Sequence, residues 1–487
     1  MKKKILIFSP GIIITNDFFI QYPSFKDIVD DFDVYVCCNA DHKGSDPKLF
    51  SNMGFKEVFE HHLSKKREKT KHWQLHINTV GARRLSRHAN IIYTMNKKDY
   101  GRFNARLVHR IFGCTPTTAK WANDLFERYI GEDRTIKEII DSVRPDLIIT
   151  FLAGAGALEI ESTKAGKTNN IPVLGIQAAW DRIGGRGLLP FRPDYMGVWG
   201  YQSRIIAERL QKMPPERIVH IGAPFGDALK RPPQQSDAAI RAALGLPAGK
   251  RVLMFAGNIW AYNEVRNLKI FNDAIESGKL ADCCIFYRPH PFQHRAKDDI
   301  EFSKQNFKHI YLDPQLADEY TQAHQQKRAY AFSKTKVGID FRYLKDVMSV
   351  LSGVITPLGT PTIQGAMCGV PSVVILYVDR ANERYWRRCE YEHFDIIRGM
   401  PGIILCLGPN ELIECCQRAL DFSKKTSAID VMKNTVKSVV YDDELAFSQR
   451  VRHAVDAILY PDRRSIYNFL HKPVLDLTKK QNVIDFT

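Results

Sequence analysis

A strand-turn-helix segment at residues 353–376 has the residue types and spacing needed to bind a phosphorylated ligand. An apolar run ends at Gly359 and Thr360, a helical pattern follows, and Gly369 ends that helix. The first turn of a helix offers unpaired backbone N–H groups and the positive end of the helix dipole, which suit a diphosphate. The hydroxyl groups of Thr360 and Thr362 add hydrogen-bond donors. The alternative is a plain capping turn, which any α/β protein contains many times.

A second polar segment follows another apolar run and reads YRPHP (287–291). Arg288 offers a forked cationic group for a phosphate, and a protonated His290 is suited to neutralise charge on a leaving group. A rigid exposed turn would use the same residues without any chemistry. Gly257 and Asn258 open a loop after the first strand expected in the second half of the chain, where a glycine permits close backbone approach to a phosphate.

Asp181 lies in a polar stretch, residues 177–194, that we expect at the carboxyl end of a parallel strand. Open α/β sheets bind their ligands at this edge. An aspartate there is suited to act as the general base that takes a proton from an acceptor hydroxyl. A loop aspartate that only caps its neighbours fits the same pattern. Three basic residues of this stretch either hold an anionic acceptor or stay solvated: Arg182, Arg186 and Arg192.

The sequence predicts no metal site. Asp31 and Asp33 form an Asp-x-Asp pair, but they precede an N-terminal strand, where a charged loop is the simpler interpretation. The ten cysteines include adjacent pairs in apolar segments, and they lack the Cys-x-x-Cys and Cys/His spacings of zinc sites. Buried free thiols in a reducing compartment fit this usage, so we expect a cytoplasmic protein.

The elements that must position these residues alternate between short apolar strands and helices, which predicts parallel sheets with helices on both faces. In the first half, strands are expected at 4–9, 34–38, 147–151, 173–177, 196–199 and 219–222. In the second half, they are expected at 251–256, 284–288, 309–312, 353–356, 372–377 and 402–407. Helices are expected between them at 155–163, 204–212, 237–244, 343–351, 362–368 and 409–422. Residues 42–125 fit this alternation of strands and helices poorly.

Two domains of similar size follow from the same pattern. A proline-rich polar stretch at 230–236 separates the two runs of strands. We therefore expect an N-terminal Rossmann-like domain at 1–230, suited to the acceptor, and a C-terminal Rossmann-like domain at 231–440, suited to the nucleotide. Residues 441–487 begin with a helical, amphipathic pattern.

Charge and hydropathy limit the class of protein and its partners. The 487 residues are 44% hydrophobic and 25% charged, as in ordinary globular proteins. Pro10 and Gly11 interrupt the apolar start, which favours a buried strand over a signal peptide, and no run reaches the roughly 20 apolar residues of a membrane span. The net charge is +16, and residues 61–110 hold thirteen Lys/Arg against two acidic residues. This block is either a solvated face or a surface for an anionic membrane or acceptor, and no nucleic-acid-binding motif accompanies it.

Residues 353–376 resemble the donor-binding strand-helix-strand unit of two-domain (GT-B) glycosyltransferases and of the UDP-N-acetylglucosamine 2-epimerase group. The segments 177–194 and 287–291 are similar to stretches of CDP-glycerol glycerophosphotransferase-like proteins of bacterial surface-polymer synthesis. The resemblance implies that the turn at Gly359 binds the donor phosphates, and that a basic residue and a histidine face the pyrophosphate. The helix residue that holds the ribose is typically Glu in those families. It is Gln364 here, which can hydrogen-bond a diol but carries no charge.

The resemblance implies an α/β fold of GT-B type, with two facing Rossmann-like domains, a cleft between them, and C-terminal helices that pack back on the first domain. It implies a metal-independent glycosyltransferase or glycerophosphotransferase-like enzyme that needs no separate cofactor. The donor would be a nucleotide sugar or a CDP-alditol, and the acceptor a glycan or lipid-linked molecule in surface glycan synthesis. The protein would then work in the cytoplasm, peripherally on the inner face of the membrane. Two alternatives stay open: a nucleotide-sugar 2-epimerase of the same fold, and a non-catalytic protein that binds a membrane or polyanion through its basic region.

Overall fold

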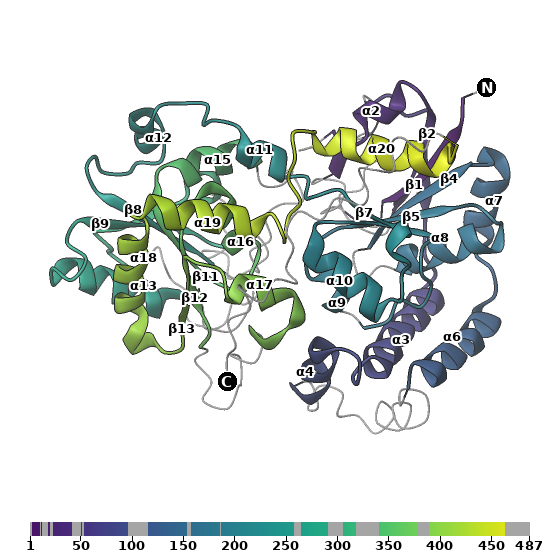
Figure 1. The fold of residues 1–487 in the computed structure, drawn as a ribbon, viewed down its shortest axis with the longest axis horizontal. Helices are drawn as coiled ribbons and strands as arrows, with labels where there is room; N and C mark the ends of the chain where they lie inside the picture. The colour runs from purple at the N-terminus through teal and green to yellow at the C-terminus, as the bar shows by residue number, and fades with distance from the viewer. Residues whose placement is uncertain are drawn as a thin grey trace. The chain divides into compact units, whose positions relative to one another are not determined.

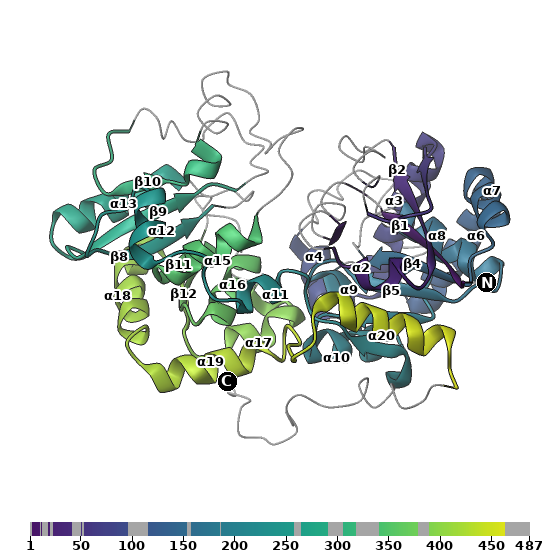
Figure 2. The same ribbon diagram turned by 90° about the horizontal axis from the view of Figure 1, so that it is seen from above.

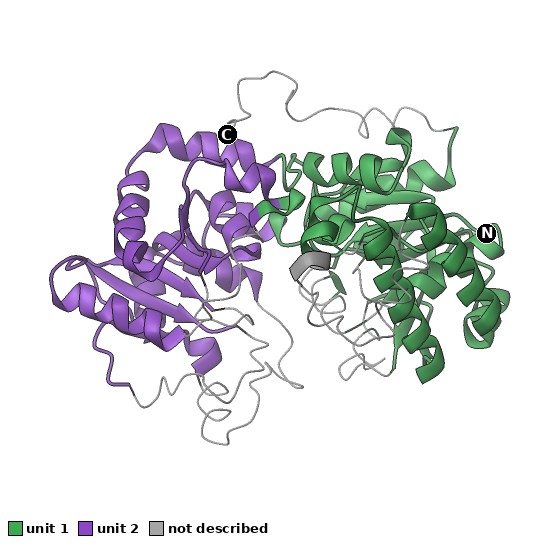
Figure 3. Cartoon of the chain, turned by 90° about the horizontal axis from the view of Figure 1, so that it is seen from below, with its two compact units in different colours: residues 1–226, 390–393, 438–482 green, residues 227–389, 394–437, 483–487 purple. Residues whose placement is uncertain are grey.

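The structure is a computed structural model, and its contacts divide the chain into two compact units (Figure 3). Unit 1 comprises Met1–Gly226, Glu390–His393 and Ser438–Asn482; unit 2 comprises Asp227–Cys389, Phe394–Lys437 and Val483–Thr487. The structure describes residues 2–9, 11, 18–19, 23–40, 50, 53–95, 115–152, 157–185, 187–257, 264–290, 305–317, 340–377 and 389–462. The chain therefore passes from one unit to the other after Gly226, around Glu390–His393 and again after Lys437.

Unit 1 is built on a parallel sheet, which has seven strands among the described residues (Figure 1). Their order across the sheet is β3-β2-β1-β4-β5-β6-β7. The strands are β1 (Lys4–Ser9), β2 (Asp33–Asn39), β3 (Glu57–His61), β4 (Leu147–Leu152), β5 (Val173–Gln177), β6 (Tyr195–Val198) and β7 (Ile218–His220). In the register, Ile5 of β1 lies between Val34 of β2 and Leu147 of β4. The prediction of a buried strand at residues 4–9 is confirmed.

Helices cover both faces of the sheet of unit 1. The helical elements are α2 (Lys26–Val29), α3 (Lys65–Gly81), α4 (Arg87–Met95), α6 (Pro116–Ile130), α7 (Arg134–Val143), α8 (Ala157–Thr168), α9 (Arg182–Gly185), α10 (Tyr201–Leu210), η3 (Pro215–Arg217) and α20 (Phe447–Leu459). Ile5 and Ile7 of β1 belong to one core with α2 and α20, which lie side by side in Figures 1 and 2. Leu6 and Phe8 belong to another core, with α7 and α8. Strands that are buried on both faces read as continuous apolar runs, which made them predictable.

The segment between β2 and β4 departs from the alternation of single strands and single helices. The edge strand β3 is followed by α3, α4, α6 and α7 before the chain returns to the sheet. The sequence analysis did not predict β3, because Glu57 and Glu60 face solvent and leave only a short apolar pattern. Nor did it predict α3, because the buried side of this helix is largely polar and includes Lys71 and Gln74.

Unit 2 is built on a second parallel sheet, with six strands in the described parts of the chain. Their order is β10-β9-β8-β11-β12-β13. The strands are β8 (Arg251–Ala256), β9 (Cys283–Arg288), β10 (Ile310–Leu312), β11 (Leu351–Pro357), β12 (Ser372–Ile375) and β13 (Ile403–Cys406). The helical elements are α11 (Gly226–Lys230), α12 (Asp237–Ala243), α13 (Glu264–Glu276), α15 (Phe341–Ser349), α16 (Thr360–Cys368), α17 (Asp395–Arg398), η7 (Pro409–Glu411), α18 (Leu412–Phe422) and α19 (Thr426–Val436). The short element η6 (Glu392–Phe394) begins in unit 1 and ends in unit 2.

One face of the second sheet forms a continuous apolar core with α13 and α18. Leu253 and Phe255 of β8 face this core, together with Phe271 of α13 and Leu420 of α18. The intervening Met254 is also buried, so this strand has no solvent-exposed face. The prediction of an α/β protein with two Rossmann-like parallel sheets is confirmed.

A buried arginine anchors the C-terminal helix α20 to the sheet of unit 1. Arg450 donates from Nε to the carbonyl oxygen of Ile221 at 2.7 Å, just beyond β7. Its Nη1 donates to Asp443 Oδ1 and to the carbonyl oxygen of Leu445, each at 2.7 Å. The side chain is almost fully enclosed, so these acceptors satisfy a charge that would otherwise be costly to bury.

We expect Arg450→Met to lower the free energy of unfolding by about 2–4 kcal/mol, because buried carbonyl oxygens and Asp443 would lose their donor. Urea denaturation followed by tryptophan fluorescence measures this loss. Lys424→Met is the matched control, since Lys424 pairs with Asp421 at 3.1 Å on the exposed surface of α18 and the turn that follows it. Its effect should stay below about 0.5 kcal/mol. Equal effects of the two substitutions would contradict an anchoring role for Arg450.

Candidate functional site

The predicted donor-site residues of unit 2 lie at one edge of the second sheet. From β8 the chain proceeds to β9 and β10 on one side, whereas β11, β12 and β13 extend to the other side. The order of strands therefore reverses between β8 and β11, and in open α/β sheets ligands bind outside the carboxyl ends of the strands at such a point. Gly257 follows β8, Arg288 ends β9, and Gly359 follows β11. Asn258 lies outside the described residues.

Helix α16 begins directly at this edge. Gly359, which has no side chain that could cap the helix, is its N-cap in an extended conformation, and Pro361 occupies the first turn as the sequence predicted. The N–H group of Thr362 donates to the carbonyl oxygen of Gly359 at 3.1 Å. Gly369 ends the helix in the left-handed conformation, with φ of 79°. The helix start thus presents the positive end of its dipole and the N–H of Thr360 at this edge, because Pro361 has no N–H and that of Thr362 is already hydrogen-bonded.

The polar side chains of α16 divide between two faces of the helix. Thr360 and Gln364 are four residues apart and share a face. Thr360 is half-buried, and Gln364 is buried. Thr362 lies about 200° around the helix from Thr360. Its side chain is fully buried, and its hydroxyl makes no hydrogen bond with the residues that the structure describes. The face with Thr360 and Gln364 is therefore the one suited to a nucleotide, and Thr362 contributes its backbone to the helix start.

A buried cluster fixes the guanidinium of Arg288. Arg288 forms an ion pair with the carboxylate of Asp313, which follows β10. The hydroxyl of Tyr343 donates to Asp313 Oδ1 at 2.7 Å, and the Tyr343 ring lies 5.8 Å from the guanidinium. Burial and the Asp313 carboxylate raise the pKa of Tyr343, so its phenol stays protonated and donates. Arg288 is thus held in place by a partner that offsets part of its charge.

Gly257 is required by contacts within unit 2. A Cβ at this position would lie 2.7 Å from Glu264 Oε2 and 2.9 Å from the backbone nitrogen of His290. Glu264 is fully buried at the start of α13, and the hydroxyl of Tyr287 donates to its carboxylate. The glycine thus permits the loops after β8 and β9 to approach each other. His290 is half-buried at the end of the described part of its loop.

Three polar residues that support this edge were not identified from the sequence: Glu264, Asp313 and Tyr343. Asp313 directly follows a predicted strand, so its position at the carboxyl edge was readable from the sequence. The pairing of Asp313 with Arg288 could not be predicted from the sequence, because β9 and β10 lie side by side only in the folded sheet. Glu264 was not identified because the sequence pattern predicted no helix at the position of α13.

In unit 1, Asp181 lies in the turn between β5 and α9. Its carboxyl is 37% exposed, and its Oδ1 lies 3.5 Å from Nε of Arg182. The turn is fixed by the buried side chain of Gln177, which donates to the carbonyl oxygens of Ala179 and Trp180 at 3.0 Å. Gln177 Oε1 accepts from the backbone N–H of Trp199 at 2.8 Å. Asp181 therefore stands on a well-supported turn.

The other basic residues of the Asp181 stretch have different environments. Arg192 Nη1 donates to the carbonyl oxygens of Gln211 and Lys212 at 2.9 and 3.0 Å. Arg192 is an exposed residue whose guanidinium satisfies backbone carbonyl groups at the end of α10. Arg186 lies outside the described residues. Asp181 and the donor-site residues belong to different units, since the latter all fall in unit 2.

The segment Glu390–His393 forms a polar and aromatic cluster within unit 1 that the sequence did not reveal. The ring of Tyr391 stacks on His88 at 3.8 Å, and His393 meets Trp180, next to Asp181, edge to face at 5.1 Å. Glu392 pairs with Arg209 at 2.5 Å. Burial, and then the charge of Arg182, lowers the pKa of His393 to about 3, so this imidazole is neutral near pH 7. The sequence could not reveal these contacts, because Glu390–His393 is far along the chain from its partners His88, Trp180 and Arg209.

Potential metal ligands have other contacts. Asp31 pairs with Arg452, and Asp33, the first residue of β2, lies 3.4 Å from Lys56. Among the described residues, the sulfur and oxygen atoms of one trio lie within 4.8 Å of one another: Cys406, Glu411 and Cys415. The two thiols donate to backbone carbonyl oxygens, Cys406 to that of Gly408 and Cys415 to that of Leu405. The nine described cysteines are free thiols.

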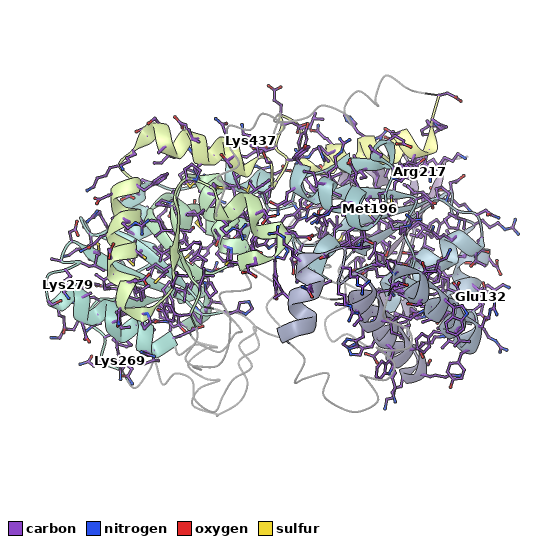
Figure 4. All side chains as sticks on the ribbon, turned by 60° about the horizontal axis from the view of Figure 1, so that its bottom comes forward. Glu132, Met196, Arg217, Lys269, Lys279 and Lys437 are labelled. Atoms are coloured by element: carbon purple, nitrogen blue, oxygen red, sulfur yellow. The ribbon has the colours of Figure 1, made fainter. Side chains whose placement is uncertain are left out.

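The structure corrects the interpretation of the basic block at 61–110. Arg67 pairs with Glu161 at 2.9 Å and with Asp133 at 3.3 Å, and it also donates to the carbonyl oxygen of Glu132, which Figure 4 labels. Lys71 pairs with Glu127 at 2.5 Å and is nearly inaccessible. These two cations stabilise the packing of α3 inside unit 1, and only part of the block is available to a partner.

Comparison with known proteins supports the fold and one family resemblance. A family model described as "CDP-Glycerol:Poly(glycerophosphate) glycerophosphotransferase" matches residues 190–321, a range that contains Gly257, Arg288 and His290. No curated protein matches the sequence. Among the described residues, no helix is both long and apolar enough to cross a membrane.

Several solved structures resemble this chain. A putative UDP-N-acetylglucosamine 2-epimerase from Listeria monocytogenes aligns over 95% of this chain and 97% of its own, with 14% identity and a TM-score of 0.50. UDP-GlcNAc 2-epimerase from Neisseria meningitidis, bound to UDP-GlcNAc, aligns over 93% and 99%, with 10% identity and a TM-score of 0.49. The wall teichoic acid polymerase TagF aligns over 95% and 89%, with 13% identity and a TM-score of 0.44. The chain thus shares the α/β fold of the Listeria structure, and residues 190–321 match the glycerophosphotransferase family model.

Proposed function

We propose that this protein is a nucleotide-dependent transferase of bacterial surface-polymer synthesis. It moves a group from a nucleotide sugar or CDP-alditol to a glycan or lipid-linked acceptor. The observation that carries this proposal is that α16 starts, and β9 ends in Arg288 followed by His290, at the same carboxyl edge of the second sheet. The family match over residues 190–321 supports the interpretation that the protein is a transferase.

The donor pyrophosphate is held by charges and dipoles that the folded chain has already oriented. The start of α16 supplies the positive end of its dipole and the backbone N–H of Thr360, since Pro361 has no N–H and that of Thr362 already donates to Gly359. Arg288 supplies a guanidinium whose position Asp313 fixes, so little reorganisation is needed when charge develops on the leaving nucleotide. His290 donates a proton or positive charge to the leaving phosphate. Gln364 hydrogen-bonds the ribose. Together these groups support transfer without a metal ion.

Unit 1 takes the acceptor, with Asp181 as the general base. Its carboxyl is partly exposed on a turn that buried hydrogen bonds hold in place, which suits removal of a proton from an acceptor hydroxyl. The protein is proposed to work in the cytoplasm, at the inner face of the membrane. There, exposed cations of its basic region attract an anionic surface.

Two other functions receive less support. A nucleotide-sugar 2-epimerase would share the fold, but the family match is to a transferase. A non-catalytic membrane-binding or polyanion-binding protein would not need the supported donor edge of unit 2. Nucleotide binding and turnover separate these alternatives from the proposed transferase.

We expect His290→Ala and Arg288→Lys each to weaken the binding of UDP or CDP about tenfold, measured by calorimetry. Each substitution removes one charge-assisted or forked contact to phosphate, worth roughly 1.5 kcal/mol. Arg288→Lys keeps a cation beside Asp313 and so spares the fold. Uridine or cytidine should be affected less, because neither carries a phosphate. Gln364→Ala should weaken nucleoside and nucleotide alike.

Thr362→Val is the matched control on the same helix. Valine removes only a buried hydroxyl that has no hydrogen-bond partner in the described part of the chain. Nucleotide affinity should therefore stay unchanged, and the free energy of unfolding should rise by about 1 kcal/mol. If Thr362→Val weakens binding as much as His290→Ala, the assignment of faces on α16 is wrong. If none of the substitutions alters nucleotide binding, the donor site lies elsewhere.

We expect Asp181→Asn to lower turnover by roughly 10²- to 10⁴-fold while donor affinity stays near that of the parent protein. The amide keeps the shape of the carboxylate but cannot accept the proton. Turnover is measured as nucleotide release from the donor that calorimetry selects. Glu208→Gln is the control, because it neutralises another half-exposed carboxylate of unit 1 that pairs with an arginine, Arg204. Parallel losses of turnover and donor affinity in Asp181→Asn would assign Asp181 a structural role.

A further inference from the structure

Three potential metal ligands meet where β13 passes into α18. Cys406 is the last residue of β13, Glu411 is the last residue of η7, and Cys415 is the fourth residue of α18. Their sulfur and oxygen atoms all lie within 4.8 Å of one another. Their spacing in the chain, Cys-x4-Glu-x3-Cys, differs from that of the usual zinc motifs, so the sequence did not indicate this group.

The packing of α18 against β13 fixes the positions of the three residues (Figure 1). Leu412, the first residue of α18, is fully buried in the apolar core of the second sheet. Cys415 then lies over the strand, with its sulfur 3.8 Å from the carbonyl oxygen of Leu405. The backbone N–H of Leu407 donates to Oε2 of Glu411 at 3.4 Å, which turns this carboxylate back toward the end of β13. The three side chains are therefore brought together by the fold of unit 2 itself.

Two thiolates and one carboxylate form a ligand set that suits a divalent ion such as Zn²⁺. In tetrahedral coordination with ordinary bond lengths, such ligand atoms stand about 3.5–3.8 Å apart. Side-chain shifts of about 1 Å therefore close this group around an ion. The thiol protons now donate to backbone carbonyl oxygens, and these weak hydrogen bonds are lost at small cost when a metal replaces the protons.

The surroundings allow an ion to reach this group. Cys406 and Cys415 are buried, whereas Glu411 and Leu407 are exposed, so the carboxylate marks the side that faces solvent. The positive end of the α18 dipole lies beside the ligands and favours their negative charge. The group stands on β13, two strands from β11, so it is separate from the donor residues at the β8/β11 edge and does not rest on the proposed function.

We propose that Cys406, Glu411 and Cys415 bind one Zn²⁺ ion, which ties the start of α18 to the end of β13. On binding, the two thiols release their protons and form two zinc–sulfur bonds, and the carboxylate supplies the third bond. Water completes the tetrahedral coordination, since the chain supplies three ligands. The ion stabilises the folded form of unit 2 by mass action, because the ligands come together only in that form.

The test is metal binding by the full chain, after reduction and removal of metal with a chelator. Co²⁺ is the first probe, because bound thiolates give it a near-ultraviolet charge-transfer band whose intensity follows the number of sulfur ligands. One equivalent of Co²⁺ should produce this band, and Zn²⁺ should displace it. Cys415→Ser should reduce the band at saturating Co²⁺ to roughly half. It should also weaken Zn²⁺ binding by more than about 100-fold in competition with a chromophoric chelator, because even indirect partners of a metal ligand contribute 10- to 100-fold.

The carboxylate is tested separately. Glu411→Gln should keep the two-sulfur band and weaken Zn²⁺ binding about tenfold or more, since the amide is a poorer ligand than the carboxylate. Glu414→Gln is its matched control, because Glu414 is an exposed carboxylate at the start of the same helix. Cys416→Ala is the control for the thiols, since it removes the buried neighbour of Cys415. Both control variants should bind Co²⁺ and Zn²⁺ like the parent protein.

Alkylation supplies a readout that needs no variant. One equivalent of Zn²⁺ should slow the reaction of N-ethylmaleimide with Cys406 and Cys415, located by peptide mass mapping. The rate at the half-buried Cys368 should stay unchanged. A reduced parent protein that shows neither the Co²⁺ band nor protection by Zn²⁺ would overturn the proposal. Metal binding that Cys415→Ser leaves unaltered would also overturn it, because the ion would then be held by other residues.

Discussion

The candidate donor site depends on the hydrogen-bonded pairing of β8 with β11, two strands that β9, β10 and α15 separate in the chain. Leu253 pairs with Gly353 and Phe255 with Ile355, in parallel register. A Cβ at Gly353 would lie only 2.9 Å from Leu253 Cδ2, so the glycine makes room for this pairing. Because the strands are parallel, their carboxyl ends share an edge, and the loop after β8 and the start of α16 meet there. Any other strand order would separate these groups.

Buried polar contacts then hold the loops at the strand ends. Asp313 and Tyr343 fix Arg288 in unit 2, and Gln177 fixes the turn that carries Asp181 in unit 1. Hydrogen bonds in a low-dielectric interior are strong when every group is satisfied, and they orient charged groups before a ligand arrives. Catalysis by electrostatic stabilisation needs such orientation, because a group that must reorganise loses much of its effect. The residues around the candidate site are thus as important to the proposed chemistry as those in it.

The charges of α3 show how one helix can serve both packing and surface attraction. Lys71 contributes to an internal network with Glu127, whereas Lys66 and Lys69 are exposed, and Lys66 lies over the ring of Tyr129 on α6. A buried ion pair contributes little net charge to the field outside the protein, while exposed lysines determine it. A count of basic residues along the sequence therefore overestimates the charge available to a membrane or acceptor.

The sequence by itself determined the elements whose signals are local. Apolar runs located β1, β5 and β8, because strands buried on both faces need continuous apolar side chains. The pattern from Gly359 to Gly369 located the helix start and its end for the same local reason. The edge strand β3 and the polar buried face of α3 escaped, because their stability comes from neighbours elsewhere in the chain. Only the tertiary structure decided that Asp313 pairs with Arg288, that Thr362 lies on the buried side of α16, and that Glu390–His393 belongs to unit 1. These contacts join residues distant in sequence, and they are selected by the strand order and by the requirement that buried polar groups find partners.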